Sequence, residues 1–165
     1  GVSTKSASRC FDELEYLNID VLGMKGKSRV INIPDDREQL WQQIENVLRN
    51  PVIRRFVLRE DMKLEKKAGI SALCEYSLLS DNVYPTYAVT KKELKDSGVK
   101  VEKQVSELEE IGCVVLELGY FIDFLGKGFQ DPLSVVLSLT GEEQEEERVD
   151  ISINEMLEEY VWSKD

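Results

Sequence analysis

Histidine is absent from the 165 residues of this sequence. Its absence excludes the Ser–His and Cys–His pairs that activate nucleophiles, and also the zinc motifs that contain histidine. Catalysis by carboxylates alone stays open as a third class of function, but no spacing of acidic residues supports it. We therefore expect a protein that is not an enzyme and that has no catalytic residue, no metal site and no cofactor.

Cysteine is scarce, and long hydrophobic runs are missing. Cys10, Cys74 and Cys113 are odd in number and widely spaced, which fits neither a disulfide framework nor a zinc ribbon. Each lies among apolar neighbours, so we expect all three to be buried as small hydrophobic side chains. No apolar run approaches the roughly 18 to 20 residues that span a bilayer. Residues 1–5 also lack the apolar segment of a signal peptide, so we expect a cytoplasmic protein without membrane association.

The charge is strongly negative and unevenly distributed. The net charge is −11, and 42% of the residues are hydrophobic, enough for a sizeable core. Residues 1–67 carry thirteen basic and eleven acidic side chains, a net charge of +2. Residues 68–165 carry eight basic and twenty-one acidic side chains, a net charge of −13. Because nucleic acid repels acidic surfaces, any contact with phosphate is expected from the N-terminal part.

The first 33 residues predict a helix followed by a β-hairpin. Ser3 is a suitable N-cap for a helix over residues 4–17, whose apolar positions recur at spacings of three and four. Two β-rich runs, 20–24 and 28–33, flank a glycine turn. Small polar and basic side chains at the start of the helix suit the major groove, and a basic hairpin tip suits phosphates. The candidate DNA-binding residues are Ser3, Thr4, Lys5, Ser6, Ser8, Arg9, Lys25, Lys27 and Arg29.

The remaining sequence alternates between helical and strand patterns, so the fold class is α+β. Arg54, Arg55 and Arg59 give one strand a basic character, which we expect to be neutralised by acidic side chains elsewhere. Residues 99–112 fit neither pattern. Helices are expected over 35–50, capped by Asp35 with Glu38, over 62–79, over 131–139, capped by Asp131, and from about 143 to 162. A short helix capped by Thr90 should end at Ser97 and Gly98. Strands are expected over 52–59, over 83–89 at an edge of the sheet, and over 113–119.

The segment Val2–Leu17 (VSTKSASRCFDELEYL) resembles the recognition helix of MarR-like winged-helix regulators, and Lys25–Arg29 (KGKSR) is similar to their wing. Further stretches resemble regulators related to AbiEi-type antitoxins of bacterial abortive-infection systems. These stretches are residues 69–73 with 84–89, residues 131–139, and residues 147–151 leading into 155–157. The resemblance implies DNA-binding transcriptional regulation, with a C-terminal domain that senses or contacts a partner.

A winged helix has two further helices before its recognition helix, whereas this sequence begins at that helix. We therefore expect the chain to be the C-terminal part of a longer regulator. Residues 1–50 would form a partial winged helix with a connecting helix, and residues 51–165 a mixed α/β sensor or partner-binding domain. The apolar face of the first helix, with Cys10, Phe11 and Leu14, would then lack its usual partners. We expect it to be covered by the C-terminal part, by the helix over 37–50, or by a second protomer, which leaves a homodimer open. The alternative function is an antitoxin-like interaction module, in which the acidic domain neutralises a partner toxin.

Overall fold

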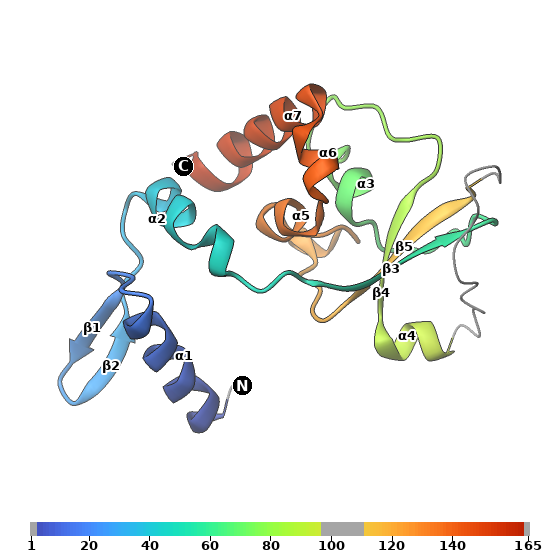
Figure 1. Cartoon of the computed structure of the whole chain (residues 1–165). Helices are drawn as coiled ribbons and strands as arrows, with labels where there is room; N and C mark the ends of the chain where they lie inside the picture. The colour runs from blue at the N-terminus through green and yellow to red at the C-terminus, as the bar shows by residue number, and fades with distance from the viewer. Residues whose placement is uncertain (1–2, 97–110, 164–165) are drawn as a thin grey trace. The chain divides into compact units, whose positions relative to one another are not determined.

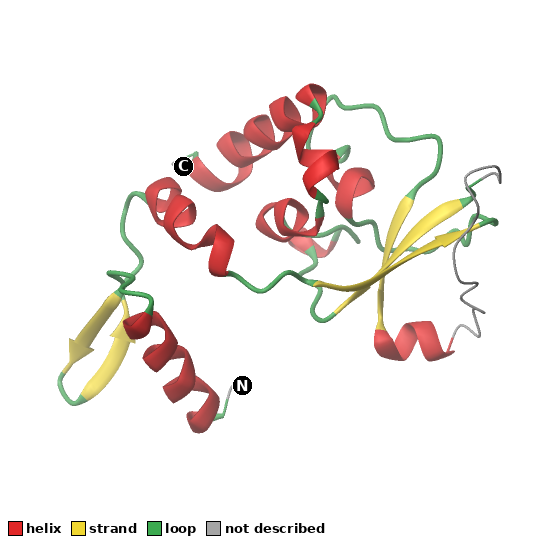
Figure 2. Ribbon diagram, viewed as in Figure 1, coloured by secondary structure: helices red, strands yellow, loops and turns green. Residues whose placement is uncertain are grey.

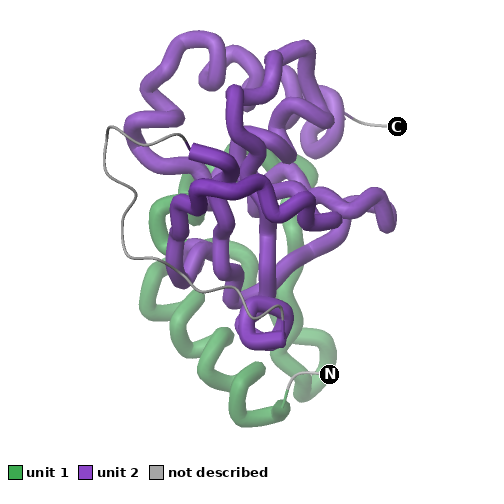
Figure 3. Tube along the Cα trace, turned by 90° about the vertical axis from the view of Figure 1, so that its right-hand side faces the viewer, with its two compact units in different colours: residues 1–48 green, residues 49–165 purple. Residues whose placement is uncertain are grey.

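The computed structural model describes residues 3–96 and 111–163. The chain divides into two compact units, Gly1–Leu48 and Arg49–Asp165 (Figure 3); the boundary had been expected after residue 50. The first unit holds helices and a hairpin, and the second holds a three-stranded sheet with helices (Figure 2). The prediction of an α+β fold is therefore confirmed.

The Gly1–Leu48 unit opens with the predicted helix and hairpin (Figure 1). Helix α1 (Thr4–Tyr16) begins after Ser3, whose hydroxyl accepts a hydrogen bond from the backbone N–H of Ser6 at 3.1 Å. Strands β1 (Leu22–Lys25) and β2 (Ser28–Ile31) pair antiparallel around a two-residue turn. Gly26 has a φ of 65° at the first turn position. This is the pattern of a type II′ turn, in which glycine is favoured.

The next helix starts one residue later than predicted. Asp36, rather than Asp35, caps α2 (Arg37–Ile44), because its carboxylate accepts a hydrogen bond from the N–H of Gln39 at 2.9 Å. The helix then tightens into a 3-10 turn, Glu45–Val47, short of the expected end at residue 50. Trp41 of α2 is buried, with 7% of its surface exposed.

The Gly1–Leu48 unit has a small core. Its buried hydrophobic residues are Ile19, Val21 and Trp41, and α1 contributes none. Cys10 is exposed, so the prediction that it is buried is wrong, whereas Cys113 is buried and Cys74 is half-buried. The reason is that a single amphipathic helix cannot bury its apolar face without a partner surface.

The Arg49–Asp165 unit is built on a mixed sheet in the order β3-β5-β4. Central β5 (Cys113–Leu118) runs antiparallel to β3 (Val52–Leu58) and parallel to β4 (Thr86–Thr90). All six residues of β5 are buried; five of them are apolar, as expected for a central strand, and the sixth is Glu117. The predicted edge position of the strand after Pro85 is confirmed by β4.

A group of helices that contacts the sheet through α3 and β4 forms an apolar cluster of its own. Helices α3 (Gly69–Leu73), α5 (Pro132–Ser138) and α7 (Glu147–Leu157) pack together, and α6 (Gly141–Glu145) precedes α7 (Figure 1). Asp131 caps α5 as predicted. The cluster that they bury contains Ile70, Ala72, Leu73, Tyr76, Phe129, Val135, Leu139, Val149, Ile153, Met156 and Leu157.

One predicted helix is mostly absent, and another is interrupted. Of residues 62–79, five form a helix, because the backbone of Lys67 pairs instead with Gly128 and Gln130. The expected final helix is broken at Glu146, after Thr140 and Glu143 form a capping box that starts α6. Its end widens into a π-helical turn, Glu158–Trp162.

The short helix α4 (Lys91–Asp96) follows β4, and reciprocal bonds between Thr90 and Glu93 confirm its predicted cap. Its expected end at Ser97 and Gly98, and residues 99–110 of the ambiguous stretch, lie outside the described residues. Within the described ranges, no helix combines the length and the apolar character needed to cross a membrane.

Candidate nucleic-acid interface

The first half of α1 is a solvent-exposed polar surface. The six candidate residues there all have exposed side chains: Ser3, Thr4, Lys5, Ser6, Ser8 and Arg9. The hydroxyls of Ser3 and Ser6 lie 2.9 Å apart and share a hydrogen bond, so part of their hydrogen-bonding capacity is used locally. The positive end of the helix dipole lies at the same end as Lys5 and Arg9, and it adds to their attraction for anions.

Charge is segregated along α1. Lys5 and Arg9 occupy its first turns, whereas Asp12, Glu13 and Glu15 occupy the second half. At 1.5 Å rise per residue, the centres of these two groups lie about 9–10 Å apart along the axis. The N-terminal half can therefore meet phosphate while the acidic half points along the helix away from it.

The hairpin adds two exposed lysines. Lys25 ends β1 and pairs in register with Ser28, and Lys27 occupies the second position of the turn. Both side chains are exposed. Both lysines therefore lie at the exposed tip of a short, paired hairpin, where they can contact a phosphate backbone.

Arg29 fastens the hairpin to the helix. Its Nη1 donates to the carboxylate of Asp12 at 2.8 Å, and its Nη2 donates to the hydroxyl of Ser8 at 3.1 Å. The guanidinium also lies 4.9 Å from the centre of the Phe11 ring. The structure thus brings Ser8 and Arg29 together, and it places Arg29 in an internal tie rather than at the free hairpin tip.

The other basic side chains of this surface are not held in ion pairs. Across the part of the chain that the structure describes, Lys5, Arg9, Lys25 and Lys27 take part in no ion pair. Four side chains are thus available to neutralise phosphates directly, and a fifth, Arg29, becomes available if its tie to Asp12 opens.

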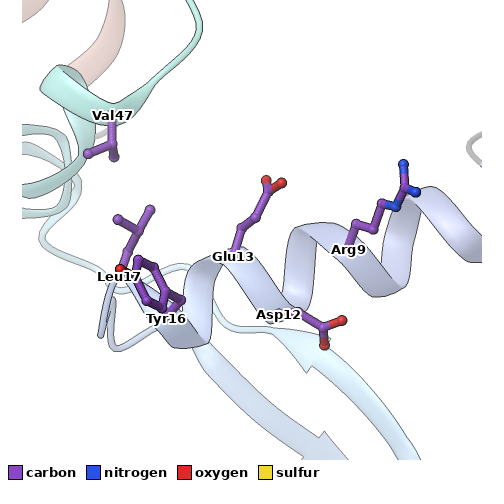
Figure 4. A pocket seen from close by; sticks show the side chains of 6 residues that line it. All are labelled: Arg9, Asp12, Glu13, Tyr16, Leu17 and Val47. Atoms are coloured by element: carbon purple, nitrogen blue, oxygen red, sulfur yellow. The ribbon is translucent and has the colours of Figure 1, made fainter.

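An open hollow of about 700 Å³ lies beside the C-terminal half of α1. Figure 4 shows Val47 opposite Leu17 and Tyr16, with Glu13 and Arg9 farther along the helix. Tyr16 is 89% exposed and Val47 is 49% exposed. The lining mixes both signs of charge with exposed apolar groups, so the hollow has no set of converging polar groups that would select a small ligand.

The arginines of β3 are bound within their own unit. Arg54 donates from Nε to the Glu117 carboxylate at 2.6 Å, and Arg55 pairs with Glu143 of α6. Burial raises the pKa of Glu143, but the hydrogen bonds from Arg55 and Thr140 and the charge of Arg55 together outweigh it, so the pKa lies below its ordinary value. The prediction that acidic side chains neutralise this basic strand is confirmed for both arginines.

Sequence reasoning missed Asp12 and Phe11 as parts of this surface. Asp12 lies 17 positions before Arg29, and no local pattern reports a contact over that separation. The register that places Arg29 opposite Met24 could have been inferred from the turn glycine, but the approach of the hairpin to α1 could not. In the described ranges, no group of three Cys, Asp or Glu side chains is placed to hold a metal ion.

Comparison with known proteins adds no relative, since no family model, curated protein or solved structure matches the chain.

Proposed function

We propose that the Gly1–Leu48 unit binds double-stranded DNA and that the protein is a transcriptional regulator acting in the cytoplasm. The first half of α1 enters the major groove, and the β1–β2 hairpin lies along the phosphate backbone. The observation that carries this proposal is the tie of Arg29 to Ser8 and Asp12, which joins the exposed helix and the basic hairpin tip into one surface.

The proposed surface would make two kinds of contact with DNA, one to base edges and one to phosphates. Hydroxyls of Ser6 and Ser8 and the fork of Arg9 present donors and acceptors of the kind that read base edges. Ammonium groups of Lys5, Lys25 and Lys27 supply contacts that fix position without selecting sequence. The bonds of Arg29 to Asp12 and Ser8 hold the hairpin with its two lysines against α1, so that helix and hairpin engage DNA together.

Binding of the full chain to a fluorescent mixed-sequence duplex tests this function. Replacing Lys25 and Lys27 by alanine should weaken binding at low salt by at least about tenfold, because each lost phosphate contact removes counterion release. The matched control replaces Lys91 and Lys92, two adjacent exposed lysines of α4, by alanine. Equal weakening by both pairs would mean that binding follows overall charge and not this surface.

A second function, neutralisation of a partner toxin, is favoured by the acidic C-terminal segment. Residues 141–163 carry nine acidic side chains against one basic side chain, Arg148. Such a surface suits a basic protein partner. Co-expression with the product of the neighbouring gene, followed by size-exclusion chromatography, should give a complex. Separate elution of the two proteins would remove this function.

A further inference from the structure

Leu125 occupies a backbone position that leucine rarely adopts. The carbonyl of Phe124 accepts a hydrogen bond from the N–H of Lys127 at 3.1 Å, which closes a tight turn. Leu125 has φ 54° and ψ 25°, and Gly126 has φ 70°. Positive φ at both central positions is typical of a type I′ turn, which favours Asn, Asp or Gly at the first of them. Local backbone preference therefore does not explain leucine here.

Burial does not explain it either. The Leu125 side chain is 76% exposed, so it contributes little to the core. A large apolar side chain that is both strained and exposed has its reason outside the fold of its own chain. Contact with another molecule would supply that reason, because the side chain would then lose its exposure on binding.

The turn is held firmly at its base. The Asp123 carboxylate accepts a hydrogen bond from the N–H of Gly128 at 2.8 Å, and the N–H of Phe124 donates to the carbonyl of Phe129 at 3.0 Å. The Phe124 ring lies edge-on to Tyr160, with ring centres 5.9 Å apart. A tip fixed in this way binds a partner without the entropic cost of ordering a loose loop.

Tyr160 extends the apolar surface from a second irregular element. It lies in the π-helical turn Glu158–Trp162 and is 38% exposed. Single π-helical turns within helices are frequent at functional sites. We name Phe124, Leu125 and Tyr160 the Leu125 patch: two distant segments of chain that meet through ring contacts.

The surroundings of the Leu125 patch are predominantly acidic. Asp123, Glu158 and Glu159 are exposed and adjoin its members in sequence. Lys127 is the basic residue of the turn, and its ammonium lies 6.0 Å from the centre of the Phe129 ring. An apolar centre with a mainly acidic border is complementary to an apolar stripe flanked by lysine or arginine.

We propose that the Leu125 patch binds a cationic amphipathic helix of a partner protein, with Leu125 inserted between the apolar side chains of that helix. The partner's lysines and arginines would face Asp123, Glu158 and Glu159. This inference does not require DNA binding. It shares Glu158 and Glu159 with the acidic segment of the second proposed function, but it rests on Phe124 and Leu125, which lie outside that segment, so the Leu125 substitution tests it separately.

The test uses Leu125→Asn in the full chain. Asparagine is close to leucine in size and suits the turn, so the melting temperature should stay equal or rise. The probe is a synthetic amphipathic helix of leucine and lysine, and its affinity should fall by at least about tenfold when the leucine contact is lost. Leu78→Asn is the matched control, since Leu78 is fully exposed elsewhere in the same unit.

Four outcomes would overturn the proposal. One is an equal loss of peptide affinity in Leu125→Asn and Leu78→Asn. Another is equal binding of a scrambled peptide of the same composition, which would show attraction by charge alone. The third is Leu125-dependent binding to vesicles of phosphatidylcholine and phosphatidylglycerol without binding to the peptide, which would assign the patch to a membrane surface. A fall in the melting temperature of both Leu125→Asn and Leu125→Gly would show a structural leucine and also overturn it.

Discussion

Replacing Asp12 by asparagine should increase the dependence of DNA binding on salt. The Asp12 carboxylate accepts a hydrogen bond from Arg29 at 2.8 Å, and the two side chains are 64% and 39% exposed. Asparagine keeps the shape of the side chain but removes its charge. Arg29 then loses its ionic partner and can turn toward a phosphate, because an exposed ion pair of this kind contributes only about 0–1 kcal/mol.

The size of the effect follows from the number of available cations. Four side chains (Lys5, Arg9, Lys25 and Lys27) give a slope of log affinity against log salt of about −3.6, at about −0.9 per phosphate contact. Between about 50 and 200 mM salt this slope corresponds to a loss of about 150-fold in affinity. With Arg29 released the slope becomes about −4.5, and the loss over the same range becomes about 500-fold.

Fluorescence anisotropy over this salt range, with the full chain and one duplex, measures both slopes. Removing a carboxylate also weakens repulsion directly, so the same substitution is made in an Arg29→Met background. If release of Arg29 is the cause, Asp12→Asn leaves the slope unchanged in that background. The reasoning is refuted if Asp12→Asn steepens the slope in the Arg29→Met background, or if it leaves the slope unchanged in the otherwise wild-type chain. Either result would mean that Asp12 does not keep Arg29 from contacting a phosphate.

Three further predictions concern the Arg49–Asp165 unit. Arg54→Met should lower the free energy of unfolding by about 2–3 kcal/mol in urea denaturation, because Glu117 is 2% exposed and would lose its partner; a second change, Glu117→Leu, should restore most of it. Gly112→Ala should cost about 1–3 kcal/mol, since a Cβ there would lie 2.4 Å from a backbone oxygen just after β3; a melting temperature equal to wild type would contradict this. The hydrogen bond from Lys66 lowers the pKa of Glu93 to about 2. The ionised Glu93 side chain therefore contributes fully to the stability of the fold above the ordinary pKa of 4.5, and this contribution is lost as pH falls toward 2. Glu93→Gln should therefore abolish that part of the acid sensitivity, and unchanged acid unfolding would count against the ion pair.

Local sequence signals predicted much of the fold. Ser3, Thr90 and Asp131 each marked a helix start that the structure confirms, because an N-cap acts on N–H groups within three residues of itself. The turn at Gly26 was equally readable, since positive φ favours glycine. These signals are short-range, and their physical cause lies wholly within the segment that displays them.

The failures arise where distant segments decide the conformation. Residues 62–68 carry a helical pattern, but the Lys67 backbone bonds to Gly128 and Gln130, more than 60 positions away. Cys10 lies on the apolar face of α1, yet no residue of that helix is buried. In the candidate site, the exposed cations were readable from sequence, whereas the tie between Arg29 and Asp12 depends on the approach of the hairpin to the helix.

The charge of the whole chain sets a last test of DNA binding at low ionic strength. The Arg49–Asp165 unit carries fifteen basic and twenty-four acidic side chains, a net charge of −9, and it is tethered to the proposed interface. At about 0.1 M salt the Debye length is about 10 Å, so phosphates respond chiefly to cations in direct contact. At about 0.01 M it reaches about 30 Å, so the net negative charge of the tethered unit contributes long-range repulsion in addition to these contacts. The plot of log affinity against log salt should therefore bend and flatten below about 0.05 M. A straight line down to the lowest salt would mean that the acidic unit does not oppose binding by the exposed cations of α1 and the hairpin.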